Sequence, residues 1–167
     1  MANPKKANIL EQDNTGLKEQ YLTFNVGSEI YGLKLEQAKE IIKPPKVTNV
    51  PNTEEYILGV INLRGQVIPV INLKNKLGLK AEFAAEDNEE KTKKIVVINI
   101  KDMLIGLYVD GVNEVINLPV DEIEGVSDNR QGIREEFIQG VSSFEDALII
   151  VLDIDNLLFS EKEEKGA

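Results

Sequence analysis

The chain has 167 residues, 42% of them hydrophobic, which is enough to bury one ordinary core or two small ones. Its 29 acidic and 19 basic residues give a formal net charge of −10, which argues against nucleic-acid or anionic-membrane partners because both favour clustered Lys and Arg. The sequence holds no Cys and no His, which excludes disulfides, thiol chemistry, zinc-thiolate sites and histidine general bases.

The first 19 residues are polar and aperiodic, and we expect residues 1–19 to form a flexible N-terminal tail. No apolar segment of a signal peptide follows the start, and the longest aliphatic run, residues 147–152, is too short to cross a bilayer. We therefore expect a cytoplasmic protein that does not insert into a membrane.

The ordered part is expected to begin with two strands, over residues 21–26 and 30–35, joined by a glycine turn. Apolar residues at helical spacing then predict a short helix over residues 36–42. Pro44 and Pro45 would end it, because proline cannot donate to a helix and restricts the residue before it. Residues 47–51 should be an extended connection.

Residues 56–73 form the central apolar stretch of the sequence, and they contain a single charge, Arg64. Two β-branched segments flank a short polar break, which predicts a β-hairpin with a three-residue loop, Gly65 at a positive φ and Arg64 at the tip. Pro69 lies inside the second strand and cannot donate to a ladder, so we expect this strand to be an edge or to carry a break.

A short capped helix should follow this hairpin. Asn72 suits the N-cap of a helix over residues 73–77, and Gly78 suits a left-handed C-cap. The charged residues 81–94 are expected to be a solvated linker.

The sequence after the linker repeats the sequence before it. Residues 95–109 align with residues 21–35 at a constant offset of 74, and residues 140–153 align with residues 59–72 at an offset of 81. This order of elements predicts two copies of a five-stranded β-unit, and hence an all-β protein of two small barrels packed on each other. We expect a first barrel over residues 20–80, a second over residues 95–160, possible strand exchange between them, and an acidic tail over residues 161–167.

The two copies differ at the hairpin tip. The first copy has Arg64 and Gly65 there, and the second has Glu145 and Asp146. Shared architecture does not require an arginine, so Arg64 is a candidate for function.

Catalytic and metal-binding motifs find little support. Residues 153–156 begin like a calcium loop, but the sixth position holds no glycine. The carboxylate clusters at residues 54–55, 121–124 and 135–136 show no spacing that would hold an acid/base pair, and no phosphate-binding loop is present. We expect no enzyme activity, no cofactor and no metal.

Residues 59–65, Gly-Val-Ile-Asn-Leu-Arg-Gly, followed by Ile68-Pro69-Val70, resemble the signature of the CheW-like family of chemotaxis coupling proteins. Residues 31–41 and 106–112 are also similar to that family. The resemblance covers roughly residues 19–159 and implies two five-stranded SH3-like barrels, in agreement with the repeat.

The resemblance implies a free-standing adaptor that joins the cytoplasmic tips of chemoreceptors to the histidine kinase CheA. Its partners would be the regulatory domain of CheA and the helical hairpin of the receptor, and it would be recruited to receptor arrays at the membrane. Five residues match the functional motif and are expected to bind partners: Glu40, Gly59, Asn62, Arg64 and Gly65. Pro69 is also expected to bind partners, because an apolar edge strand beside the hairpin tip would suit docking. We expect an ion pair between Glu40 and Arg64, bidentate if the geometry allows. A groove lined by Ala38, Ile41 and Ile95 is the candidate receptor site.

Two alternatives remain at this stage. One is an SH3-like peptide-binding module outside chemotaxis, which would need an aromatic groove that the 5% aromatic content disfavours. The other is a small hydrolase with paired carboxylates, which would need a deep pocket with two convergent carboxylates.

Overall fold

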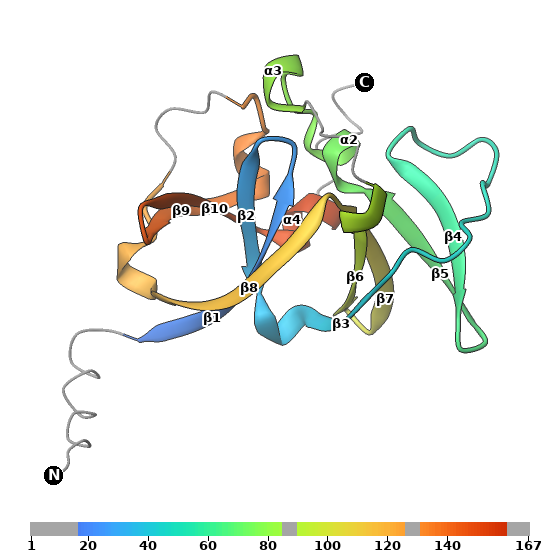
Figure 1. The fold of residues 1–167 in the computed structure, drawn as a ribbon, viewed down its shortest axis with the longest axis horizontal. Helices are drawn as coiled ribbons and strands as arrows, with labels where there is room; N and C mark the ends of the chain where they lie inside the picture. The colour runs from blue at the N-terminus through green and yellow to red at the C-terminus, as the bar shows by residue number, and fades with distance from the viewer. Residues whose placement is uncertain (1–16, 85–89, 126–130, 160–167) are drawn as a thin grey trace, which may run out of the picture.

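The computed structural model describes residues 17–84, 90–125 and 131–159, and within them it has ten strands in two five-stranded sheets (Figure 1). The strands are β1 (Lys18–Val26), β2 (Glu29–Lys34), β3 (Ala38–Ile42), β4 (Ile57–Leu63), β5 (Gln66–Asn72), β6 (Lys94–Ile100), β7 (Met103–Val109), β8 (Gly111–Pro119), β9 (Ile138–Phe144) and β10 (Ala147–Leu152). The short helices are α2 (Leu73–Leu77), α3 (Ala81–Ala84) and α4 (Ile154–Phe159), with 3-10 turns η1 (Leu35–Gln37), η2 (Glu90–Thr92), η3 (Val120–Glu122) and η4 (Glu135–Phe137). The predicted all-β fold is confirmed.

The two sheets exchange hairpins. Sheet A has the order β8-β1-β2-β10-β9, and sheet B has the order β3-β6-β7-β5-β4. The β1–β2 hairpin of the first half thus lies in the sheet that holds β8, β9 and β10, while the β6–β7 hairpin of the second half lies with β3, β4 and β5. Residues 20–80 and 95–160 are therefore not two separate barrels, because each sheet needs strands from both ranges.

The sequence repeat is visible in the strand register. Strands β4 and β9, Ile57–Leu63 and Ile138–Phe144, begin and end 81 residues apart. Tyr21 pairs with Ile116 in sheet A, and Ile95 pairs with Ile42 in sheet B, so the partners in the two sheets differ by the same 74 residues. The two sheets are built to one plan.

Three apolar clusters hold the fold together. One small cluster belongs to sheet A and is formed around Tyr21, Ile149 and Val151, and another belongs to sheet B and is formed around Ile61, Val70 and Ile95. The largest cluster combines residues of both sheets and of helices α2 and α4. Its members include Phe24, Tyr31, Leu33, Leu73, Val96, Ile98, Leu107, Ile150 and Leu157. Burial of this cluster fixes the sheets against each other.

The helix expected over residues 36–42 is wrong. Only the 3-10 turn η1 forms, and the residues after it become strand β3, which pairs antiparallel with β6. The apolar spacing suits a helix, but pairing with β6 supplies backbone partners along one side of β3, and the β-branched side chains of Ile41 and Ile42 also fit a strand.

The hairpin tip has two loop residues instead of the expected three. Leu63 pairs with Gln66, which leaves Arg64 at φ 51° and Gly65 at φ 87° in the turn. Positive φ at both positions is typical of a type I′ turn, whose twist matches that of the flanking strands. Gly65 has the positive φ that was expected. Arg64 also has a positive φ, which is sterically unfavourable for a residue with a Cβ atom.

Pro69 lies in β5, which is internal to sheet B, but Pro69 itself has no partner on the β7 side, which agrees with the expected edge or break at this residue. Pairing of β5 with β7 begins only at Val70, one residue after Pro69, while Pro69 itself pairs with Val60 of β4. The missing N–H of proline is tolerated because the β7 side of the ladder has not yet begun there.

The capped helix after the hairpin is confirmed. The Oδ1 atom of Asn72 accepts hydrogen bonds from the backbone N–H groups of Lys74 and Asn75, and Gly78 ends the helix in the left-handed conformation at φ 64°. This cap fixes α2 directly after β5.

A substitution of Gly59 should destabilise the protein strongly. Gly59 has φ 151°, and a Cβ atom there would meet the carbonyl oxygen of Thr48 at 2.3 Å. We expect Gly59→Ala to lower the free energy of unfolding by about 2 kcal/mol or more in urea denaturation. The matched control is Gly65→Ala, which also has a positive φ but no atom within 4 Å of its Cβ, and should cost about 1 kcal/mol. Equal losses would contradict the steric explanation.

Candidate partner-binding surface

An ion pair between Arg64 and Glu40 marks the exposed end of the β4–β5 hairpin. The Nη2 atom of Arg64 donates to the Oε2 atom of Glu40, which comes from strand β3. The side chain of Arg64 is 70% exposed, and that of Glu40 is 29% exposed. The contact joins one nitrogen to one oxygen and is not the bidentate pair that we considered. The hydrogen bond and the charge of Glu40 raise the pKa of the Arg64 guanidinium above its usual value.

The side chain of Asn62 shapes this tip. Its Oδ1 atom accepts a hydrogen bond of 2.9 Å from the backbone N–H of Gly65, across the turn that carries Arg64. A side-chain acceptor of this kind stabilises a tight turn. Asn62 and Gly65 therefore set the direction in which Arg64 leaves the hairpin.

Two further motif residues lie away from the tip. Gly59 is buried in β4 beneath the chain at Thr48, where its lack of a side chain is a packing requirement. Pro69 is exposed on the outer face of β5. The structure thus brings Glu40, Asn62, Arg64 and Gly65 together and leaves Gly59 and Pro69 outside this group.

The groove expected from Ala38, Ile41 and Ile95 is wrong in one of its three members. Ile95 is fully buried at 0% exposure, inside the apolar cluster of sheet B, because its position in β6 points into the sheet's own core. Ala38 is half-buried, and Ile41 is 42% exposed on β3, next to Glu40 in sequence. Ile41 and Glu40 are consecutive in β3 and point to opposite faces of the strand, so the three expected residues do not line one groove.

Sequence reasoning missed two exposed apolar residues near the tip, Val67 at 65% and Met103 at 44% exposure. The alternation of β5 contains the signal for Val67, because Ile68 and Val70 face the core of sheet B and the residues between them must face outward. Met103 follows a two-residue turn whose members both have positive φ, and no sequence pattern identifies it as exposed.

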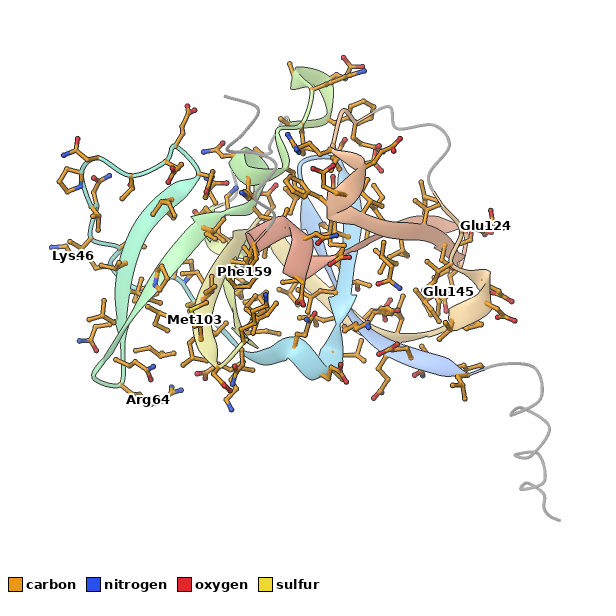
Figure 2. All side chains as sticks on the ribbon, turned by 180° about the vertical axis from the view of Figure 1, so that it is seen from behind. Lys46, Arg64, Met103, Glu124, Glu145 and Phe159 are labelled. Carbon is orange, nitrogen blue, oxygen red and sulfur yellow. The ribbon has the colours of Figure 1, made fainter. Side chains whose placement is uncertain are left out.

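The tip of the second copy lies far from the first. In Figure 2, Arg64 and Glu145 are at opposite ends of the molecule. Glu145 and Asp146 have φ values of 50° and 68°, so their turn has the same form as that of Arg64 and Gly65 with opposite charge. The two ends of the protein therefore present different chemistry on one framework.

Other candidate sites do not assemble. Asp153 acts as a helix cap, since its Oδ1 atom accepts a hydrogen bond of 3.1 Å from the backbone N–H of Asn156. Within residues 17–84, 90–125 and 131–159, no three His, Cys, Asp or Glu side chains are grouped so that they could hold a metal ion. The same ranges contain no helix long and apolar enough to cross a bilayer.

Two interlocked sheets that expose hairpin tips and strand faces are typical of a protein-interaction module. The family model of the CheW-like domain matches residues 20–162, and the chain belongs to this family. It is accordingly a coupling adaptor of chemotaxis signalling, and neither a module outside chemotaxis nor a hydrolase is favoured.

Individual relatives agree over nearly the whole chain. A chemotaxis protein CheW of Treponema pallidum is 35% identical over 148 residues, covering 89% of this chain and 86% of the relative. One of Bacillus subtilis is 34% identical, covering 89% and 92%. Among solved structures, the scaffolding protein TtCheW of Thermoanaerobacter tengcongensis aligns with a TM-score of 0.74 and 31% identity, over 86% of this chain and 89% of that one.

Proposed function

We propose that this protein joins the helical hairpin at the cytoplasmic tip of a chemoreceptor to the regulatory domain of the histidine kinase CheA. It would do so in the cytoplasm, recruited to receptor arrays at the membrane, and without catalysing a reaction. The observation that carries the proposal is the ion pair between Arg64, at the exposed tip within the segment that resembles the family signature, and Glu40 of strand β3.

The geometry of the tip suits docking. Arg64 is held by two constraints, the turn closed by Asn62 and the hydrogen bond to Glu40, so little side-chain freedom is lost when a partner arrives. Arginine presents several N–H donors, and only one of its nitrogens is engaged by Glu40.

We assign separate roles to the motif residues. Arg64 and Glu40 would contact the partner, Asn62 and Gly65 would hold the tip, and Pro69 would contribute exposed apolar surface. Gly59 would act indirectly, by allowing the chain at Thr48 to pack against β4.

The absence of catalysis is supported by where the carboxylates lie. The Glu54–Glu55 pair and the Asp121–Glu122 pair are exposed and stand in different connections of the chain. A hydrolase would instead require two carboxylates converging in a deep pocket.

Removal of the Arg64 side chain should weaken partner binding. We expect Arg64→Ala to reduce the affinity for the CheA regulatory domain, for a receptor tip fragment, or for both, by about tenfold or more, as measured by isothermal titration calorimetry. Arg134→Ala is the matched control, because Arg134 is also an exposed arginine paired with a glutamate, Glu136, at another part of the surface. Unchanged affinities for both partners would contradict the role of the tip, and an equal loss in the control would show a general charge effect.

A further inference from the structure

A groove of about 520 Å³ lies on the outer face of sheet B, where β5, β7 and α4 meet. Figure 2 shows Met103 and Phe159, both of which line it, on the same side of the molecule as Arg64. Its apolar lining comes chiefly from Tyr56, Val67, Pro69, Met103, Ile105 and Phe159. Val67 and Met103 are exposed to 65% and 44%, and exposed apolar surface of this kind is unfavourable in water.

The internal repeat supplies a comparison for this groove within the same molecule. The positions of sheet A that correspond to Tyr56 and Pro69 are Phe137 and Ile150, and these are only 1% and 2% exposed. The same framework surface is thus covered in sheet A and open in sheet B.

The chain itself covers the groove of sheet A. Ile133 is 1% exposed and belongs to the same apolar cluster as Phe137 and Ile150. Its segment is fixed by a 2.9 Å hydrogen bond from the backbone N–H of Lys80 to the carbonyl oxygen of Gln131. A branched aliphatic side chain on a short polar segment is therefore buried in the cluster that contains this surface.

Among the residues that the structure describes, none plays the part of Ile133 at the groove of sheet B. The residue that corresponds to Ile133, 81 positions earlier, is Asn52, and it is exposed. After Phe159 the sequence continues with Ser160–Ala167, which contains no large apolar side chain. A second copy of the chain is a poor donor as well, because its Ile133 is buried in its own fold.

We propose that the groove of sheet B is a docking site for a short segment of a partner protein that inserts one branched aliphatic side chain, as Ile133 does in sheet A. Gln66 and Asp102 lie at the groove and offer polar partners for the backbone of such a segment. This site is separate from the ion pair of Arg64 and does not depend on its role.

The test uses the intact chain with labelled methyl groups and a synthetic peptide of residues 129–137, Asn-Arg-Gln-Gly-Ile-Arg-Glu-Glu-Phe, followed by NMR titration. We expect saturable shifts of the Val67 and Met103 methyl signals. A peptide with Ser in place of the Ile should bind about tenfold more weakly or worse, because the buried aliphatic group is lost.

Two variants locate the site. Val67→Lys should weaken peptide binding by about tenfold or more, and Leu148→Lys, at the corresponding exposed position of sheet A, should leave it unchanged. Both positions are exposed, so both variants should fold. The proposal is overturned if the methyl signals of the groove do not shift, or if both peptides or both variants bind alike. It is also overturned if the shifts appear without peptide as the protein concentration rises, because a second copy of the chain would then be the occupant.

Discussion

Neither half of this chain should fold by itself, although the two halves should fold together. Each sheet takes a hairpin from the other half, so a fragment of residues 1–86 would hold β1 and β2 without β8, β9 and β10, and β3, β4 and β5 without β6 and β7. The missing strands would leave open edges and expose the largest apolar cluster, which draws on both halves.

A protease site inserted between residues 86 and 87 tests this expectation. After cleavage the two fragments should stay associated, with native circular dichroism and a melting temperature that depends on concentration. Separated in denaturant and diluted individually, each should show no cooperative unfolding, and mixing them should restore it. A cooperative transition in either fragment alone would contradict the exchanged arrangement.

The carboxylate of Asp110 should be worth several kcal/mol of stability. Its Oδ1 atom accepts a 2.7 Å hydrogen bond from Lys93 Nζ, and its Oδ2 atom accepts one of 2.7 Å from the backbone N–H of Gly27. The side chains of Lys93 and Asp110 are 5% and 15% exposed. Lys93 precedes β6 and Asp110 follows β7, whereas Gly27 lies in the turn between β1 and β2, so the Asp110 carboxylate joins the two exchanged hairpins.

We expect Lys93→Met to lower the free energy of unfolding by about 2 kcal/mol in urea denaturation, since it removes the nearer of two cations from a largely buried carboxylate and leaves only Lys74 Nζ, 4.0 Å from Oδ2. Lys39→Met is the matched control, because Lys39 is exposed on β3, and it should change stability by less than about 0.5 kcal/mol. A loss below about 1 kcal/mol for Lys93→Met would mean that other groups compensate the carboxylate.

The repeat was predictable from the sequence, and the exchange of hairpins was not. Glycines, aliphatic runs and prolines recur in order at offsets of 74 and 81, and each recurring element has its counterpart strand in the structure. The choice of neighbouring strand was not predictable, because β5 and β10 are equally apolar and β2 could pair with either. Only the packing of the whole chain decides between them, and possible exchange could be raised from sequence without being resolved.

Local sequence patterns also gave wrong predictions where pairing between distant strands determines the structure. The apolar spacing of residues 36–42 fits a helix, yet β6 recruits the segment as strand β3. At the tip, the positive φ of Gly65 follows from its residue type, whereas that of Arg64 follows only from the two-residue length of the loop.

For the candidate site, the family resemblance led to Arg64 and Glu40, and the structure places them in contact. The groove of sheet B could not be foreseen, because its residues come from strands and a helix that are far apart in sequence. The groove stands out because the corresponding surface of sheet A is covered.

An adaptor must bind both partners at the same time. The direct measurement is multi-angle light scattering of this protein mixed with the CheA regulatory domain and a receptor cytoplasmic fragment, together and in pairs. We predict a three-component complex whose mass is the sum of the parts, with each partner able to bind in the presence of a saturating amount of the other. Displacement of the kinase domain by the receptor fragment, with only two-component complexes in the mixture, would contradict the coupling function.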